Sequence, residues 1–359
     1  MFIKNIKLNN FRNYKRQEIN LNKNTNIIFG DNATGKTTIL ESIFICSLGK
    51  SFRTNKDNEL INKDEKNANI EIEFVKKDRK GKINLKLSEK KHFFINDIKL
   101  KKTSEILGNI YIVLFSPEDI GILNNEPSKR RRFLNIMISQ LKPLYVHSLN
   151  QYSKILEQRN NYLKQIKYEN KDINLLDIWD EQLYNLGIKI YNYRKDFIKK
   201  INEKIEKIHL ETTENKEKIK IKYKTNIKDE NEYLEKMKKN RNLDVQKGFT
   251  SIGVHRDDFD IFINNEDVSI YGSQGQKRTS LISLKLAEAE VIYDEIEEYP
   301  IILLDDFMSE LDQKRIKGFI KNIKNNQVLV TCTEELSLDN MDYNLYKVDN
   351  ATIKNINKI

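Results

Sequence analysis

The spacing of apolar residues changes along the chain, and this change outlines its architecture. Near the N-terminus, apolar and polar residues alternate over four stretches, residues 1–8, 69–74, 82–87 and 93–100. Alternation is the period of a half-buried β-strand. Two short apolar runs, residues 25–29 and 110–115, predict buried strands. We therefore expect an N-terminal half-domain of mixed β-sheet.

A helical period replaces this alternation from about residue 130. Two runs space their apolar residues by about three and four positions, which is the period of one helix face. The first run comprises Leu149, Tyr152, Leu156, Leu163 and Ile166, and the second comprises Trp179, Leu183, Leu186, Ile190, Tyr193, Phe197 and Ile201. The polar residues 168–174 separate the runs, so the pattern predicts an antiparallel helical hairpin with an apolar seam. The seam is too short for a long coiled-coil arm.

Strands and helices alternate in the rest of the chain. Residues 219–223 alternate with lysines, as an exposed strand does, and residues 229–243 are helical and mostly charged. The following pattern predicts a strand over 259–263 before an Asn264-Asn265 turn, a helix over 276–297, a strand over 301–304, a helix over 313–323 and a strand over 328–331. We therefore expect a parallel-containing α/β domain, residues 1–125 and 246–359, split by a helical lobe at residues 126–245.

Chemistry enters first at the segment Gly30-Asp31-Asn32-Ala33-Thr34-Gly35-Lys36-Thr37, which lies between a predicted strand and a helix expected over residues 36–48. This is the phosphate loop G-x-x-x-x-G-K-[ST], whose glycines let successive N–H groups point at phosphate oxygens. The helix N-terminus adds a favourable partial positive charge. We expect the segment and the adjoining Thr38 to surround the phosphates of ATP, with Lys36 reaching the β and γ phosphates and Thr37 holding Mg²⁺.

Two adjacent acids follow the predicted strand at residues 301–304. They stand at its carboxyl end, where ligands of open α/β sheets bind. Asp305 is suited to hold Mg²⁺ through water, and Asp306 to polarise the water that attacks the γ-phosphate. The next segment, Ser309-Glu310-Leu311-Asp312, is expected to bring another acid toward a dimer interface.

A second predicted anion-binding surface precedes the helix at residues 276–297. Ser273, Gly275 and Gln276 offer a hydroxyl and free N–H groups at a helix start. One chain has little need for two such surfaces. If two copies meet head to head, each could cap the γ-phosphate of the ATP held by the other. A simple helix cap is the alternative interpretation.

Net charge changes this picture little. The formal charge of +10 and the pI of about 9.1 favour a polyanionic partner, but the excess is mostly lysine. Clustered arginine is better evidence, and Lys129-Arg130-Arg131-Arg132 is the candidate DNA contact, with a solvated helix end as the alternative. Cys46 and Cys332 lie in apolar runs that predict core. With no signal peptide and no long apolar run, we expect a soluble cytoplasmic protein.

The order of these motifs resembles the ABC-type ATPases, and more closely the RecF family, a DNA-repair branch related to the heads of structural-maintenance-of-chromosomes (SMC) proteins. Besides the phosphate loop, the matching segments are Asn10-Phe11-Arg12-Asn13-Tyr14, Phe115-Ser116-Pro117-Glu118-Asp119, Pro127-Ser128-Lys129-Arg130-Arg131-Arg132-Phe133-Leu134, Gln158-Arg159-Asn160, His255-Arg256-Asp257-Asp258 and Ser273-Gln274-Gly275-Gln276-Lys277-Arg278.

This resemblance implies a fold and a function. It implies an ABC/SMC-like α/β P-loop ATPase head interrupted by a helical lobe. It also implies an ATP- and Mg²⁺-dependent homodimer that binds gapped DNA at single-strand/double-strand junctions and helps a recombination mediator to load recombinase. Arg12 is implied to approach the nucleotide, and residues 116–119 to act like a Q-loop. His255 is expected to be an ordinary structural histidine.

One observation and two alternative functions qualify the expected activity. The predicted strand at 328–331 continues into Thr331-Cys332-Thr333 with no histidine to touch the γ-phosphate, which indicates a slow, weak ATPase. A nucleotide-binding subunit of an ABC transporter would share the phosphate loop, the signature and the acids. It would place them closer together than the interval from Lys36 to Ser273. A scaffold that binds ATP without hydrolysing it is a third alternative.

Overall fold

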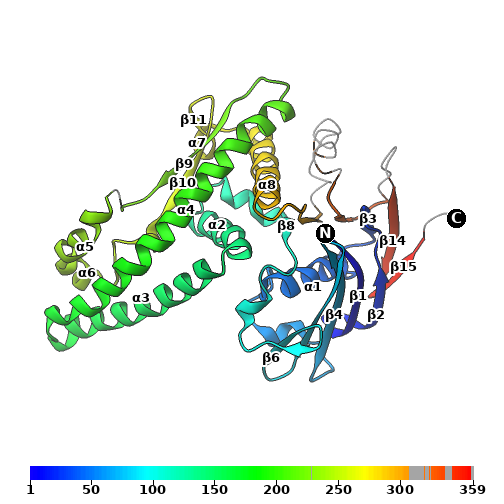
Figure 1. The fold of residues 1–359 in the computed structure, drawn as a ribbon, viewed down its shortest axis with the longest axis horizontal. Helices are drawn as coiled ribbons and strands as arrows, with labels where there is room; N and C mark the ends of the chain where they lie inside the picture. The colour runs from blue at the N-terminus through cyan, green and yellow to red at the C-terminus, as the bar shows by residue number, and fades with distance from the viewer. Residues whose placement is uncertain (228, 307–318, 320–322, 324, 336–341, 357–359) are drawn as a thin grey trace. The chain divides into compact units, whose positions relative to one another are not determined.

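The computed structural model describes residues 1–227, 229–306, 319, 323, 325–335 and 342–356 (Figure 1). The chain divides into two compact units. The first unit comprises Met1–Ile120, Lys207–Lys216 and Arg278–Ile359, and the second comprises Gly121–Glu206 and Glu217–Lys277. Nearly all of the helix expected at 313–323, and the acidic segment at 309–312, lie outside the described residues.

The first unit contains an antiparallel sheet and a largely parallel sheet, each of six strands. The antiparallel sheet has the order β2-β1-β4-β5-β6-β7. Its strands are β1 (Phe2–Phe11), β2 (Tyr14–Asn20), β4 (Ala68–Lys76), β5 (Arg79–Leu87), β6 (Lys91–Ile95) and β7 (Ile98–Lys99). The second sheet has the order β15-β14-β3-β13-β12-β8. Its strands are β3 (Thr25–Phe29), β8 (Ile112–Phe115), β12 (Ile301–Asp305), β13 (Val328–Cys332), β14 (Tyr343–Asp349) and β15 (Thr352–Asn355).

The parallel part of the second sheet forms the centre of the first unit. Strands β14, β3, β13, β12 and β8 pair in parallel, and β15 adds an antiparallel edge. Every residue of β3, β12 and β13 is buried. Parallel strands are covered on both faces, so they appear in the sequence as continuous apolar runs, as predicted here for β3 and β12.

Helix α1 (Lys36–Leu48) contacts strands of both sheets, β4 and β5 of one and β12 and β13 of the other. This double contact explains why α1 is buried on nearly all sides. Gly49 ends the helix in a left-handed conformation (φ 73°), and its N–H donates to the carbonyl of Ile45. The bounds of β3 and α1 are those predicted, so the strand, loop and helix around the phosphate motif are confirmed.

The second unit combines helices with a small sheet. Its helices are α2 (Pro127–Leu141), α3 (Pro143–Glu169), most of α4 (Leu176–Thr212), α5 (Glu230–Lys239), α6 (Arg241–Lys247) and α7 (Val268–Tyr271). Its antiparallel sheet, of order β11-β10-β9, comprises β9 (Ile219–Lys224), β10 (Asp258–Ile263) and β11 (Glu266–Asp267). Helix α8 (Gln274–Ile296) begins in this unit and continues in the first.

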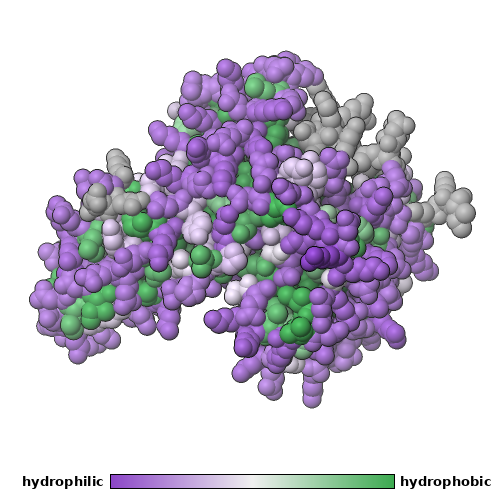
Figure 2. Space-filling view, viewed as in Figure 1, coloured by the Kyte–Doolittle hydropathy of each residue, from purple (hydrophilic) through white to green (hydrophobic). Residues whose placement is uncertain are grey.

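Helices α3 and α4 form the predicted antiparallel hairpin. The rings of Tyr145 and Tyr193 lie 5.7 Å apart, and those of Tyr162 and Trp179 lie 4.8 Å apart. The start of α3 therefore contacts the later part of α4, and the end of α3 contacts its start, so the two helices run antiparallel. The seam includes apolar residues that the spacing selected, among them Tyr152, Leu163, Leu183, Ile190 and Phe197. Figure 2 shows a largely hydrophilic surface, with apolar side chains visible at the end of the hairpin and on the first unit.

Several predicted elements differ from the structure. The single strand expected at 93–100 is two strands, because Asn96 and Asp97 adopt positive φ (48° and 67°) and form a tight turn. The helix expected at 229–243 is two helices, α5 and α6, which meet at Asn240. Strand β9 is not an exposed strand, because Ile219 and Ile221 are buried.

The boundary between the units also differs from the prediction. Residues 246–277 were expected in the split domain, but they belong to the second unit, where β10 pairs with β9. The lobe is therefore not purely helical. Strands β2, β14 and β15 were not predicted, because they mix polar and apolar residues without a clear period. In the part of the chain that the structure describes, no helix has the length and apolar character needed to cross a membrane.

Candidate functional site

Glycines at both ends of the phosphate loop are required by its geometry. Gly30 has φ 152° and Gly35 has φ 117°, conformations that side chains disfavour. A Cβ at Gly30 would lie 2.3 Å from the carbonyl oxygen of Val348, and one at Gly35 would lie 2.6 Å from Nδ2 of Asn13. Asn13 also donates from Nδ2 to the carbonyl of Thr34 at 3.1 Å. The loop is therefore fitted closely to its neighbours.

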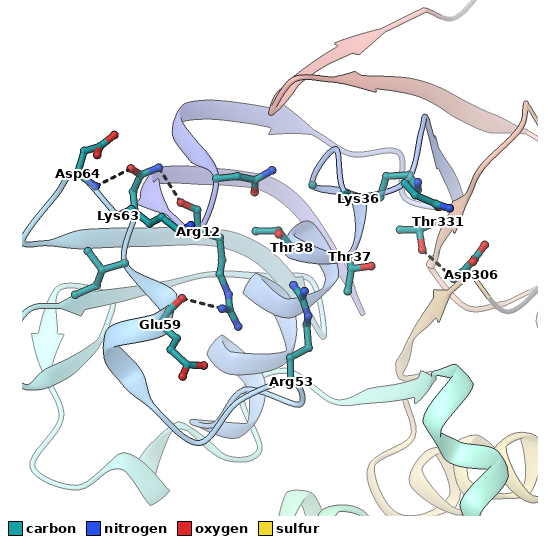
Figure 3. Close-up of a pocket in the computed structure, with 16 residues that line it drawn as sticks. Arg12, Lys36, Thr37, Thr38, Arg53, Glu59, Lys63, Asp64, Asp306 and Thr331 are labelled. Carbon is teal, nitrogen blue, oxygen red and sulfur yellow. Dashed lines mark hydrogen bonds between the residues drawn. The ribbon is translucent and has the colours of Figure 1, made fainter.

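Lys36 is held over this loop. Its Nζ donates to the carbonyl oxygens of Gly30, at 2.6 Å, and Asp31, at 2.7 Å, and the residue is buried. It faces a cavity of about 840 Å³ (Figure 3), whose lining includes the predicted residues Arg12, Asn32, Ala33, Gly35, Lys36, Thr37, Thr38 and Asp306. The ammonium is thus positioned at a cavity large enough for a nucleotide.

The phosphate loop meets the first of the paired acids. Thr37 Oγ1 donates to Asp305 Oδ1 at 2.7 Å, although 268 positions separate the two residues. Thr331 Oγ1 donates to the same oxygen at 2.9 Å and accepts from the backbone N–H of Asp306 at 3.0 Å. Burial raises the pKa of Asp305. A hydroxyl and a carboxylate in contact are oxygen ligands suited to Mg²⁺.

Arg12 lines the cavity, but its guanidinium is already paired. Its Nε and Nη2 donate to the two carboxylate oxygens of Glu41 at 3.0 and 2.6 Å, and Nη1 donates to the carbonyl of Glu59. Arg53, which sequence analysis missed, also lines the cavity, and its Nη1 lies 3.3 Å from Glu41. Glu41 is fully buried. Glu41 is the one carboxylate in the sequence of α1, and this was the signal that could have revealed these cations.

Ser273 begins α8 with a reciprocal cap. Its Oγ accepts from the backbone N–H of Gln276 at 3.2 Å, and its own N–H donates to Gln276 Oε1 at 3.0 Å. Gln276 Nε2 also donates to Glu217 Oε1 at 3.0 Å. In a single chain, Ser273 and Gln276 therefore form a helix cap, which is the alternative interpretation given above for this segment. Ser273 is exposed and belongs to the second unit, whereas the phosphate loop belongs to the first. A role of Ser273, Gly275 and Gln276 at a nucleotide stays a prediction.

The Q-loop-like segment is linked to α8 by a chain of charges. Asp119 Oδ2 accepts from the backbone N–H of Ser116 at 2.8 Å and lies 3.6 Å from Nζ of Lys285. Lys285 also lies 3.7 Å from Oε2 of Glu288. Glu288 is 2% exposed, and burial raises its pKa to about 7, an effect that Lys285 opposes.

We expect Glu288→Gln to raise the free energy of unfolding by about 3 kcal/mol at pH 8, because each pKa unit corresponds to about 1.4 kcal/mol. The folded-state pKa exceeds the ordinary glutamate value of 4.5, so the contribution of Glu288 is favourable below pH 4.5 and is lost as pH rises through 7. Urea unfolding at pH 5 and pH 8 measures the difference. The control Asp294→Asn, an exposed carboxylate on the same helix, should leave the pH dependence unchanged. Equal pH dependence in wild type and Glu288→Gln would contradict the assignment.

The candidate DNA contact at 129–132 is partly wrong. Arg130 is 3% exposed and donates from Nε and Nη2 to the two carboxylate oxygens of Asp258 at 2.5 and 2.7 Å. Arg131 Nη1 donates to the carbonyl of Asp257 at 3.0 Å. Arg130 is therefore unavailable to a DNA phosphate. Of the four residues, Lys129 is half-buried and 3.4 Å from Glu126, and Arg132 is exposed.

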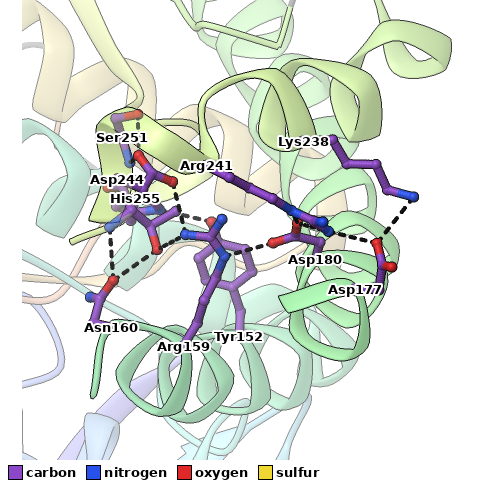
Figure 4. Close-up of polar contacts among 11 residues, drawn as sticks. Tyr152, Arg159, Asn160, Asp177, Asp180, Lys238, Arg241, Asp244, Ser251 and His255 are labelled. Carbon is purple, nitrogen blue, oxygen red and sulfur yellow. Dashed lines mark hydrogen bonds and ion pairs between the residues drawn. The ribbon is translucent and has the colours of Figure 1, made fainter. Parts of the chain in front are cut away.

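Two other segments that carry the resemblance meet in a buried network of the second unit (Figure 4). Arg159 is fully buried and bonds Asp180, Asp244 and Thr250. His255 Nε2 lies 3.0 Å from the carbonyl of Thr250, so Nε2 donates and Nδ1 accepts from the Tyr152 hydroxyl at 2.8 Å. Burial lowers the pKa of His255 to about 4, which keeps it neutral. This environment agrees with the structural role expected for His255.

Comparison with known proteins gives one consistent result. The model of the RecF/RecN/SMC N-terminal domain matches residues 2–116. The DNA replication and repair protein RecF of Clostridium botulinum (strain Okra) is 46% identical over 367 residues, covering 99% of this chain and all of that protein. The protein of the same name from Acetivibrio thermocellus is 42% identical, covering 96% of this chain and 97% of that one.

Solved structures agree with these sequence matches. One described as "the recombination mediator protein RecF-ATPrS in RecFOR pathway" has a TM-score of 0.92 at 36% identity and covers 99% of this chain and 98% of that chain. The Smc head bound to the C-winged helix domain of ScpA has a TM-score of 0.59 at 16% identity and covers 99% and 97%. The second likeness is one of fold alone. The expected ABC/SMC-like head is confirmed.

Proposed function

Because the chain belongs to the RecF family, we propose that it is an ATP-dependent DNA-binding protein of recombinational repair and replication-fork maintenance. An ATP-induced dimer binds DNA at gaps and single-strand/double-strand junctions and assists a recombination mediator in loading recombinase. Similar proteins are named for DNA replication and repair, and a solved relative for the RecFOR pathway. The transporter alternative has no support among these relatives.

A single observation carries the nucleotide part of this proposal, namely the 2.7 Å bond between Thr37 and Asp305 beside the buried ammonium of Lys36. This hydrogen bond brings together, on one side of the cavity, the residues that an Mg²⁺-nucleotide requires. The N–H groups of residues 30–38 cradle the phosphates, and Lys36 neutralises the β and γ oxygens. Thr37 and Asp305 would hold Mg²⁺, which would offset the charge of the transferred phosphoryl group.

Hydrolysis to ADP and phosphate is slow in this scheme and serves as a switch. Asp306 orients and polarises the attacking water, and Lys36 stabilises negative charge on the γ-phosphate as the bond breaks. Strand β13 supplies Thr331, which bonds both Asp305 and the backbone of Asp306, and it supplies no histidine. A threonine hydroxyl at neutral pH carries no positive charge to a γ-phosphate, so turnover is weak.

A second copy of the chain completes the site. The start of α8 offers the Ser273 hydroxyl and the N–H groups near Gly275 and Gln276 to the γ-phosphate bound by its partner. The exposed position of Ser273 supports this role, because the Gln276 N–H that donates to its Oγ at 3.2 Å can take a phosphate oxygen as a stronger, charged acceptor. ATP then links the two heads.

Light scattering with and without ATP and Mg²⁺ tests the shared site. We expect wild type to dimerise with ATP, and Ser273→Arg to bind nucleotide but stay monomeric, because the larger side chain keeps the start of α8 away from the γ-phosphate bound by the other copy. Ser153→Arg, an exposed serine on α3, is the matched control and should dimerise. Dimerisation of Ser273→Arg at the wild-type ATP concentration would refute the shared site. Dimerisation of wild type with no phosphate release after long incubation would support a scaffold instead of an ATPase.

A further inference from the structure

The net positive charge of the chain is concentrated in one segment of the first unit. Residues 76–102 contain 11 of the 63 basic residues but only three of the 53 acidic residues. Their net charge is therefore +8, out of +10 for the whole chain. A lysine-rich composition alone would spread the excess evenly. The remaining residues are close to neutral, so this segment has a distinct electrostatic character.

Most of these basic side chains are exposed and unpaired. The segment runs from the end of β4 through β5 and β6 to the residues after β7, at the edge of the antiparallel sheet (Figure 1). Lys82 pairs with Glu71 and Lys91 pairs with Asp57. Eight others are exposed and form no ion pair with a carboxylate of the described residues. This lysine edge consists of Lys77, Arg79, Lys80, Lys86, Lys90, Lys99, Lys101 and Lys102.

A basic depression lies at the turn between β4 and β5. Its volume is about 510 Å³, and its lining includes Lys77, Arg79 and Lys80 but no acidic residue. The apolar part of the lining includes Phe74, whose ring packs over Gly81. A Cβ at Gly81 would lie 2.4 Å from Cζ of Phe74, so the glycine allows this packing. The depression suits an anion, because cations surround it without a competing carboxylate.

The dimensions of the lysine edge match a long polyanion. Lys80 and Lys86 are six residues apart on β5, which places them about 20 Å apart on one face of the strand. Duplex DNA carries one phosphate charge per about 1.7 Å of its axis, so a duplex of this length carries roughly twelve phosphates around its circumference, part of which face the strand. Lysines are point charges that contact phosphate oxygens without reading bases.

Single-stranded DNA fits the lysine edge less well. Its binding sites need aromatic side chains on which bases can stack. Within residues 76–102, Phe93 is buried and Phe94 is only partly exposed, with Nζ of Lys86 5.1 Å from its ring centre. The arginine cluster at 129–132 is also a weaker candidate, because Arg130 and Arg131 bond backbone or carboxylate oxygens of their own unit.

We infer that the lysine edge binds the sugar-phosphate backbone of duplex DNA, the double-stranded side of the junction. This inference rests on the proposed function, because that function supplies the DNA. It places the DNA contact on the first unit, which also contains the phosphate loop.

Fluorescence anisotropy of the full chain with a fluorescein-labelled 30-base-pair duplex, ATP and Mg²⁺ tests the inference. The variant carries Lys99→Gln, Lys101→Gln and Lys102→Gln. We expect about ten-fold weaker binding or more, and a plot of log affinity against log salt that is shallower by about 3, because each lost phosphate contact removes about 0.9 from the slope. The matched control carries Lys154→Gln, Lys164→Gln and Lys189→Gln, which are exposed lysines of the second unit. It should bind as wild type does.

Further measurements distinguish a fold defect, failure of the inference and failure of the proposed function. Replacing the same three residues by arginine keeps the charge and should keep the slope, whereas a fold defect would affect all edge variants and their ATP binding. If the glutamine variant binds as the control does while wild type binds DNA, the lysine edge is refuted and the proposed function stands. If wild type and control both fail to bind duplex with ATP, the DNA-binding function fails and the inference fails with it. If the glutamine variant binds duplex DNA normally but no longer binds an acidic protein partner, the inference is also refuted.

Discussion

Lys36→Ala is expected to weaken ATP binding by at least about 100-fold and to abolish ATP-dependent dimerisation. The ammonium lies at the mouth of the phosphate loop, fixed by bonds of 2.6 and 2.7 Å to two loop carbonyls. It is therefore already oriented before a nucleotide arrives. A hydrogen bond to a charged group contributes about 1.5–3 kcal/mol, so two phosphate contacts exceed about 3 kcal/mol, or two decades of affinity.

Titration with a fluorescent ATP analogue measures this loss directly. Lys50→Ala is the matched control, because Lys50 is exposed just beyond the same helix and lies outside the cavity lining. It should bind nucleotide as wild type does. Unchanged affinity of Lys36→Ala would remove the phosphate loop from the proposed function. Duplex binding that no longer responds to ATP in this variant would connect the nucleotide to the DNA.

Arg159→Met is expected to destabilise the second unit by about 3–5 kcal/mol. Arg159 and Asp180 are fully buried, and their Nε–Oδ1 distance is 2.6 Å. Asp180 retains a second cation, Arg241, at 2.7 Å. Asp244 is 1% exposed and has Arg159 as its cation, at 2.8 Å. Methionine fills similar space but leaves this carboxylate buried without a positive charge, which is among the most costly defects in a protein.

Trp179 provides a local measurement of this change. It is the one tryptophan of the chain, and its ring lies against that of Tyr162 in the hairpin, so its fluorescence follows unfolding of the second unit. Urea unfolding should show a lower free energy of unfolding for Arg159→Met. It should show no change for Lys164→Met, which replaces an exposed lysine on the same helix. Adding Asp244→Asn should recover part of the stability, because it removes the unpaired charge. A shift below about 1 kcal/mol, or no recovery in the double variant, would contradict the assignment.

Local features of the site were predictable because their causes lie within a few residues. Strand β3, the phosphate loop and helix α1 form a continuous stretch in which apolar periodicity and glycine positions act together. The acids at the end of β12 were found in the same way, since a buried strand that ends in carboxylates is visible in the sequence. These predictions required no knowledge of distant partners.

The candidate DNA contact was wrong at Arg130 for the opposite reason. A run of basic residues suggests a surface until its partners are known, and the partner of Arg130 is 128 positions away. The role of Glu41 was also hidden, because this carboxylate pairs with Arg12, which lies 29 positions earlier in the chain. The charge of residues 76–102 is visible in the sequence, but only the structure shows that most of these basic side chains are exposed along one part of a sheet.

The sequence alone determined the phosphate loop, the paired acids, the helical hairpin and the family to which they belong, because each depends on spacing along the chain. Tertiary structure decided which charges are internal supports and which remain available to a ligand. It buried Arg130 and Arg159 against carboxylates and left the lysine edge exposed. Whether a charge is buried or exposed depends on long-range pairing, and desolvation makes that difference energetically decisive.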